Sequence, residues 1–209
     1  MTGNIVIISS PSGGGKGTLI KEVLKSVPNI GYSVSLTTRA QRRGEVDGVD
    51  YKFVSREEFE SFRSRDLFLE YAEVHGKYYG TSLAVTRELM AAGRDVILEI
   101  DVQGAAEVLA KVPSAISIFI LPPSFEALSQ RLTARATEGP AELELRLRNS
   151  FDEVKRYTEF EFVVINDNVT DAVKRLESVI LGQRQLRTRQ SGAIRDILVS
   201  FDISKKVHS

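Results

Sequence analysis

Short apolar runs rich in β-branched residues recur along the chain, and segments with helical spacing of apolar residues separate them. The runs predict buried strands at Ile5–Ile8, Val96–Ile100, Ile116–Leu121 and Phe162–Ile165. One helical pattern begins after Thr18 and ends near Pro28. Three others cover Leu83–Ala92, Phe125–Ala136 and Val173–Leu181. This alternation predicts an α/β protein whose core is a five-stranded parallel sheet with helices on both faces.

Two stretches interrupt the alternation. Residues 33–82 are rich in Arg, Tyr, Glu and Gly and resemble an inserted substrate module, while residues 134–149 carry several arginines around the break Gly139-Pro140. We therefore expect a single domain over 1–209, with a core of 1–32, 83–133 and 150–209, an inserted module at 33–82 and a mobile helical lid at 134–149. The amphipathic stretch Ile194–Val199 predicts a solvated terminal helix.

Composition narrows the choice of partners. The 28 basic residues balance 28 acidic residues, which argues against a nucleic-acid or membrane-surface partner. The absence of cysteine excludes disulfides and thiolate metal sites, and only His75 and His208 offer imidazole. The first apolar run is too short for a signal peptide or a membrane span, so we expect a cytoplasmic protein.

A glycine-rich loop directly follows the first predicted strand and precedes the first predicted helix. It consists of Ser10, Pro11, Ser12, Gly13, Gly14, Gly15, Lys16, Gly17 and Thr18. In this context the backbone N–H groups form an anion nest, and Lys16 reaches the β- and γ-phosphates of a nucleotide. The alternative is a flexible surface turn that contains a lysine.

The loop departs from the general phosphate-loop pattern at two positions. Ser10 replaces the first glycine, and Gly17 stands where a serine or threonine usually ligates magnesium. Thr18 is the nearest hydroxyl to the α-phosphate or the magnesium shell. The ending Gly-Lys-Gly-Thr is similar to the loop of adenylate kinases.

Five further motifs follow in order and resemble guanylate kinases of the bacterial type, which are P-loop nucleoside monophosphate kinases. The motifs are Ser33 to Arg39 with Arg42, Gly44-Glu45 and Asp50-Tyr51; Phe68-Leu69-Glu70; Tyr78-Tyr79-Gly80-Thr81; Ile100 to Gly104; and the arginines of 134–149. The resemblance runs from about Ile5 to about Asp167. It implies a transferase that uses ATP and Mg²⁺ to phosphorylate GMP in purine metabolism, with residues 33–82 as the GMP-binding module.

The resemblance also assigns the acceptor site. Arg39, Arg42, Tyr51 and Tyr79 offer donors to a phosphate dianion. Glu70 would accept from the adjacent N1–H and 2-amino groups of guanine, and Ser35 and Thr81 would bond elsewhere on the base edge. Adenine lacks this pair of donors, so such a site rejects it by about four to five powers of ten.

Residues after the strands and in the lid complete the prediction. The resemblance places Asp101 beside the guanine and the metal, either on the base or on magnesium through water, and Asn166 beside adenine. Arg131, Arg135 and Arg146 match the lid arginines that surround the transferring phosphoryl group, whereas Arg148 is expected to be a solvated charge. Taken singly, each of these side chains is also compatible with an ordinary surface or packing role.

Two rival functions fit parts of the pattern. One is a non-catalytic domain that holds a phosphorylated peptide in the acceptor site, and the retained Lys16 loop argues against it. The other is a sugar-phosphate kinase, against which Glu70, Ser35 and Thr81 argue, because a sugar acceptor needs no guanine-shaped site. The oligomeric state is left open.

Overall fold

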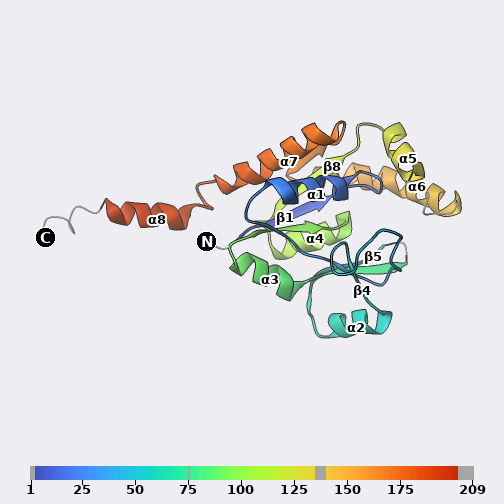
Figure 1. Ribbon diagram of the computed structural model, residues 1–209, viewed down its shortest axis with the longest axis horizontal. Coiled ribbons are helices and arrows are strands. Elements are labelled where there is room, and N and C mark those ends of the chain that lie inside the picture. Colours follow the sequence, from blue (N-terminus) through green and yellow to red (C-terminus); the bar gives the residue numbers. More distant parts are fainter. Residues whose placement is uncertain (1–2, 75, 135–139, 202–209) are drawn as a thin grey trace, which may run out of the picture.

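The computed structural model describes residues 3–74, 76–134 and 140–201. Its core is a five-stranded sheet in the order β2-β7-β1-β8-β9 with every neighbouring pair parallel (Figure 1). The strands are β1 (Ile5–Ser9), β2 (Ile30–Tyr32), β7 (Asp95–Glu99), β8 (Ile116–Leu121) and β9 (Phe162–Ile165). The predicted five-stranded parallel α/β core is confirmed.

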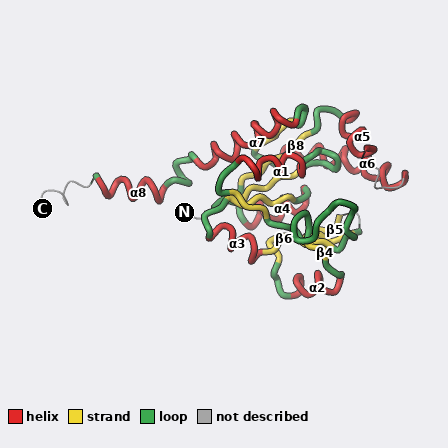
Figure 2. Tube along the Cα trace, viewed as in Figure 1, coloured by secondary structure: helices red, strands yellow, loops and turns green. Residues whose placement is uncertain are grey.

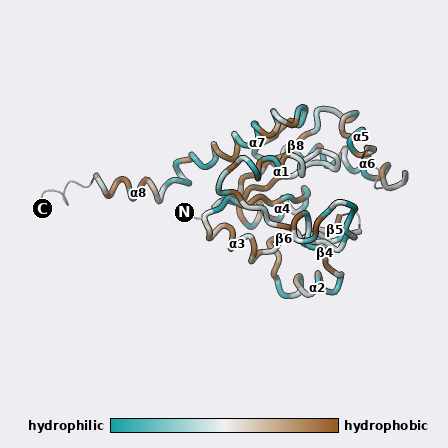
Figure 3. Tube along the Cα trace, viewed as in Figure 1, coloured by the Kyte–Doolittle hydropathy of each residue, from teal (hydrophilic) through white to brown (hydrophobic). Residues whose placement is uncertain are grey.

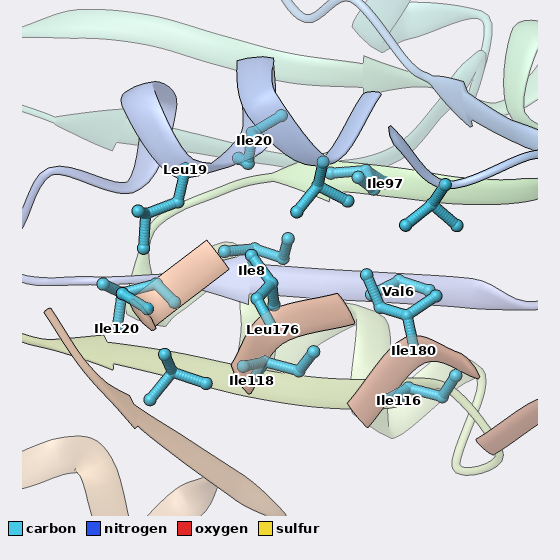
Figure 4. Packing of buried hydrophobic residues seen from close by; sticks show 14 residues of the cluster. Val6, Ile8, Leu19, Ile20, Ile97, Ile116, Ile118, Ile120, Leu176 and Ile180 are labelled. Atoms are coloured by element: carbon cyan, nitrogen blue, oxygen red, sulfur yellow. The ribbon is translucent and has the colours of Figure 1, made fainter. Parts of the chain in front are cut away.

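Strand side chains alternate between two buried layers, as the period of two requires. On one face Val6 and Ile8 belong to a cluster with residues of α1 (Lys16–Ser26) and α7 (Val169–Arg184). Figure 4 shows Leu19 and Ile20 of α1 and Leu176 and Ile180 of α7 packed over the strands. On the other face the strands pack against α3 (Leu83–Ala91) and α4 (Val102–Lys111). Burial on both faces explains why these strands read as continuous apolar runs.

The inserted segment forms a second sheet in the order β4-β3-β6-β5 (Figure 2). Its elements are β3 (Leu36–Thr37), β4 (Lys52–Phe53), α2 (Arg56–Ser64), β5 (Phe68–Val74) and β6 (Lys77–Ser82). A separate small core fills it, in which the rings of Phe59 and Phe68 lie 4.6 Å apart. The segment therefore has packing of its own beside the central sheet.

The remaining helices are α5 (Phe125–Ala134), α6 (Pro140–Lys155), a 3₁₀ turn (Arg156–Glu159) and α8 (Ser191–Ser200). α8 extends away from the body of the molecule (Figure 1) and mixes hydrophobic with hydrophilic residues along its length (Figure 3). The predicted terminal helix at 194–199 is thus present. Among the described residues, no helix combines the length and the apolar character needed to cross a membrane.

Several boundaries differ from the sequence expectation. β2 and α4 were not predicted, because one has only three residues and the other directly follows a strand end. β7 ends at Glu99, one residue before the predicted end, and Asp101 is the N-cap of α4, where its carboxylate accepts from Gly104 N at 2.8 Å. This bond satisfies a backbone donor that the first turn of a helix leaves free.

Candidate active site

A cleft of about 660 Å³ opens at the carboxyl ends of the central strands. The glycine-rich loop with the start of α1, the inserted segment, α6 and the ends of β2 and β7 line it. Open parallel sheets bind ligands at this edge because the loops after the strands converge there. The cleft brings together most of the residues that the sequence singled out.

The glycine-rich loop has the backbone geometry of an anion nest. Gly15 has a φ of 86° and caps the start of α1, and a Cβ added there would lie 2.5 Å from the amide nitrogen of Asn166. The Asn166 side chain is buried and donates to Gly14 O at 2.9 Å. Arg131 donates to Asn166 O at 2.8 Å and more distantly to Gly14 O. Asn166 and Arg131 therefore support the loop from behind and lie outside the lining of the cleft.

Lys16 lies in the first turn of α1, and its ammonium is 3.7 Å from the carboxylate of Glu99. The hydroxyl of Tyr32 donates to the same carboxylate at 3.0 Å, and burial raises the pKa of Tyr32. A Cβ on Gly17 would lie 3.5 Å from Glu99 Oε1. Glu99 thus faces the position where many phosphate loops carry a hydroxyl ligand for magnesium.

Glu70 is almost completely buried on β5, yet it is one of the residues that line the cleft. Burial and, to a smaller extent, the nearby Asp101 raise its pKa to about 7, against a hydrogen bond from Thr81 that lowers it. Gly104 leaves room for the carboxylate, since a Cβ there would lie 2.4 Å from Glu70 Oε2. Thr81 is wholly buried and orients Glu70 rather than lining the cleft.

A cationic and aromatic cluster forms another part of the inserted segment. The Arg39 guanidinium makes two bonds to the Glu45 carboxylate, at 2.7 and 3.0 Å, and lies 5.2 Å from the ring centroid of Tyr51. Glu45 also accepts from the backbone N–H of Arg42 at 2.8 Å. Tyr51 meets Tyr79 edge to face at 5.9 Å, and burial raises the pKa of Tyr51, so its hydroxyl remains a donor.

The second helix of the expected lid reaches the cleft. Arg146 of α6 is 8% exposed and lines the cleft, whereas Arg148 is exposed and pairs with Glu144. Seven residues after Arg146, the Glu153 carboxylate accepts from Ser12 N at 2.8 Å. Arg135, and His75 in the inserted segment, lie outside the described residues.

Comparisons with known proteins agree with this geometry. Residues 2–183 match the family model described as guanylate kinase. The chain is 49% identical over 196 residues to a guanylate kinase of Neisseria meningitidis serogroup A, covering 94% of this chain and 96% of the relative. It is 46% identical over 182 residues to one from Clostridium perfringens, covering 87% and 84% respectively. The chain belongs to the guanylate kinase family.

A solved structure agrees as well. The crystal structure of guanylate kinase from Anaplasma phagocytophilum superposes with a TM-score of 0.77 at 33% identity, covering 90% of this chain and 89% of that chain. The predicted resemblance and P-loop fold are therefore confirmed. The enzyme is a nucleoside monophosphate kinase, which transfers a phosphoryl group from ATP to GMP.

Within this guanylate kinase fold, three acidic residues matter more than the sequence suggested. Glu45 orients Arg39, Glu99 faces Lys16, and Glu153 contacts the phosphate loop. Glu45 belongs to the Gly44-Glu45 motif and Glu99 lies two residues before Asp101, so both carried a weak signal. Glu153 carried none, because its partner is 141 residues away in the chain.

Proposed function

We propose that the cleft carries out in-line transfer of the γ-phosphoryl group of ATP to GMP with the residues described above. The single observation that carries the residue assignment is the buried Glu70, which lines the same cleft as the phosphate loop. A buried carboxylate is costly unless donors satisfy it, so its presence in a cleft favours a ligand that donates to it.

Guanine fits this requirement. Its N1–H and 2-amino group lie side by side, and one ionised carboxylate accepts from both. Adenine presents a lone pair at N1 and lacks the 2-amino group, which would leave Glu70 with only the hydrogen bond from Thr81. The missing pair of hydrogen bonds supports discrimination against AMP. Ser35, which is buried and also lines the cleft, would bond to another part of the base edge, and Asp101 lies beside Glu70.

The acceptor phosphate would lie against Arg39, Arg42, Tyr51 and Tyr79, all of which line the cleft. Glu45 holds the Arg39 guanidinium in one plane through a bidentate pair, so the remaining donors of Arg39 have a fixed direction. Such orientation lowers the entropy that must be lost when the attacking oxygen is placed in line.

The phosphate loop would hold the β- and γ-phosphates of ATP through its N–H groups and Lys16. Arg146 would stabilise negative charge that spreads over the transferring group, and burial of its guanidinium strengthens that interaction. Arg131 would support the loop, and Arg135 is proposed from its position in the family motif alone. Asn166 would fix the loop at Gly14 on the donor side.

Mg²⁺ is expected to bind together with ATP, and the side chains present suit its coordination. Mg²⁺ in kinases usually keeps several waters and takes one or two protein carboxylates besides the substrate phosphates. Glu99 faces the side of the loop next to Lys16, and Thr18 and Asp101 also line the cleft. When bound, the ion would shield the charge of the β- and γ-phosphates.

The test is ADP formation with ATP and magnesium in the presence of GMP, AMP, a ribose phosphate or no acceptor. Strong turnover with GMP and almost none with AMP would support the assignment of Glu70. Turnover with a ribose phosphate would favour a sugar-phosphate kinase instead. Intact GMP binding without turnover on any acceptor would indicate a binding domain and refute the proposed roles of Lys16 and Arg146.

A further inference from the structure

Glu153 places a negative charge on a loop whose N–H groups are arranged for phosphate. Its carboxylate accepts from Ser12 N at 2.8 Å, and the side chain is partly buried at the edge of the cleft. Gly14 N is also used within the protein, because it donates to Pro11 O at 2.9 Å. Two N–H groups of the loop are therefore occupied by the protein itself, and Glu153 supplies the partner of one of them from a distant helix.

The position of Glu153 on α6 relates it to Arg146. Seven residues correspond to almost two full helical turns, so both side chains project from the same face of α6, about 10 Å apart along its axis. Both line the cleft. A bond that fixes the Glu153 end of this face to the loop also fixes the rotation and axial position of the helix that carries Arg146.

The exposed contacts of α6 constrain it less. Two exposed ion pairs lie within the helix, Arg148–Glu144 and Lys155–Asp152. They do not fix the position of α6 relative to the phosphate loop. Phe151 stacks on Phe125 of α5 with ring centroids 4.7 Å apart, but both rings are largely exposed. The charge-assisted bond from Ser12 to Glu153 is directional and joins α6 directly to the loop that would hold the transferring phosphates.

We infer that Glu153 is a positioning residue for phosphoryl transfer: by accepting from Ser12 N, it sets the register of α6 on the phosphate loop and so places Arg146 at the transferring group. The inference rests on the proposed function, in which Arg146 contacts that group. It predicts that loss of the bond lowers kcat and leaves the KM for GMP unchanged, because the acceptor site lies on other elements.

An opposite role is chemically distinct. If the Glu153 carboxylate occupied a place that belongs to a phosphate of ATP, removing it would relieve repulsion and lower the KM for ATP with little loss of kcat. The two roles therefore change different kinetic constants: loss of Glu153 lowers kcat in the first role and lowers the KM for ATP in the second.

The experiment compares steady-state kinetics of Glu153→Ala and Glu153→Gln with Asp152→Ala, an exposed acidic position on the same helix. We expect E153A to lose kcat about ten- to a hundredfold, since a misplacement of about 1 Å can cost a hundredfold. E153Q should stay within about threefold of the parent because its amide oxygen still accepts from Ser12. D152A should match the parent.

The decisive arm combines E153A with Arg146→Ala. If Glu153 acts through Arg146, the double variant is no slower than R146A alone. Losses that multiply would overturn the inference, as would an E153A enzyme with a lower KM for ATP and full kcat, or an E153Q enzyme as slow as E153A. An unchanged E153A would also overturn it, while a parent enzyme without GMP-dependent turnover would refute the proposed function instead.

Folding is checked by the thermal unfolding midpoint of each variant. If E153A does not fold, Glu153→Asp replaces it, because the side chain is one methylene shorter and either loses the bond or draws α6 toward the loop. A fall in kcat at constant KM for GMP is then expected for E153D, and parental kinetics in E153D would refute the register argument.

Discussion

The raised pKa of Glu70 makes GMP binding depend on pH in a way that can be calculated. Burial holds the pKa of this carboxyl at about 7 in the ligand-free protein. Only the ionised form accepts from both guanine donors, so GMP must bind to that fraction. At pH 6 about one molecule in eleven has an ionised Glu70, against about ten in eleven at pH 8, which follows from a pKa near 7.

Affinity for GMP should therefore fall about tenfold from pH 8 to pH 6, equivalent to about 1.4 kcal/mol. The second ionisation of a phosphate monoester lies near pH 6 and adds its own dependence. Glu70→Gln removes the titrating carboxyl and keeps the phosphate, so the difference between the two proteins isolates Glu70. Glu73→Gln, an exposed position on the same strand, should follow the parent.

Isothermal titration calorimetry in buffers of different ionisation enthalpy gives both the affinity and the number of protons released. At pH 6.5 the parent should release about 0.8 proton more than E70Q, since about three quarters of the Glu70 carboxyls are protonated before binding. Identical pH profiles and identical proton release in the parent and E70Q would refute the assignment of Glu70 to the base.

Further predictions concern stability and the donor site. Because the folded pKa of Glu70 is above its unfolded value, the ligand-free parent should lose up to about 3 kcal/mol of unfolding free energy relative to E70Q as pH rises from about 4.5 to about 7, measured by urea denaturation. Lys16→Ala should reduce kcat by at least about a hundredfold, with the exposed Lys25→Ala as control, and near-parental turnover would contradict the phosphate loop. Arg184→Ala leaves the buried Asp95 without its ion pair and should cost about 3 kcal/mol of unfolding free energy, and a loss below about 1 kcal/mol would show that Asp95 is satisfied otherwise. Ile118→Ala should cost about 2 to 5 kcal/mol by the same assay, since the side chain is fully buried between β8 and its covering helices.

Local sequence predicted those elements whose pattern is strong within a short window. The strands at Ile5–Ser9 and Ile116–Leu121 were recognisable because a strand buried on both faces is a continuous apolar run. The three-residue strand at Ile30–Tyr32 is too short for such a run, and α4 begins only two residues after the predicted strand end. The short strands of the inserted sheet are held by one another and by Phe59 and Phe68, so their pairing depends on partners distant in the chain.

The same distinction between local sequence and tertiary contacts applies to the candidate site. The sequence by itself determined the phosphate loop, the order of the acceptor motifs and the family, because each of these depends on residue types at fixed short spacing. Only the tertiary structure decided that Thr81 donates a hydrogen bond to Glu70. The same holds for the support of the loop by Asn166 and Arg131 and for the contact between Glu153 and Ser12. Each of those contacts joins side chains from separate elements, and their geometry exists only after the sheet and helices have packed.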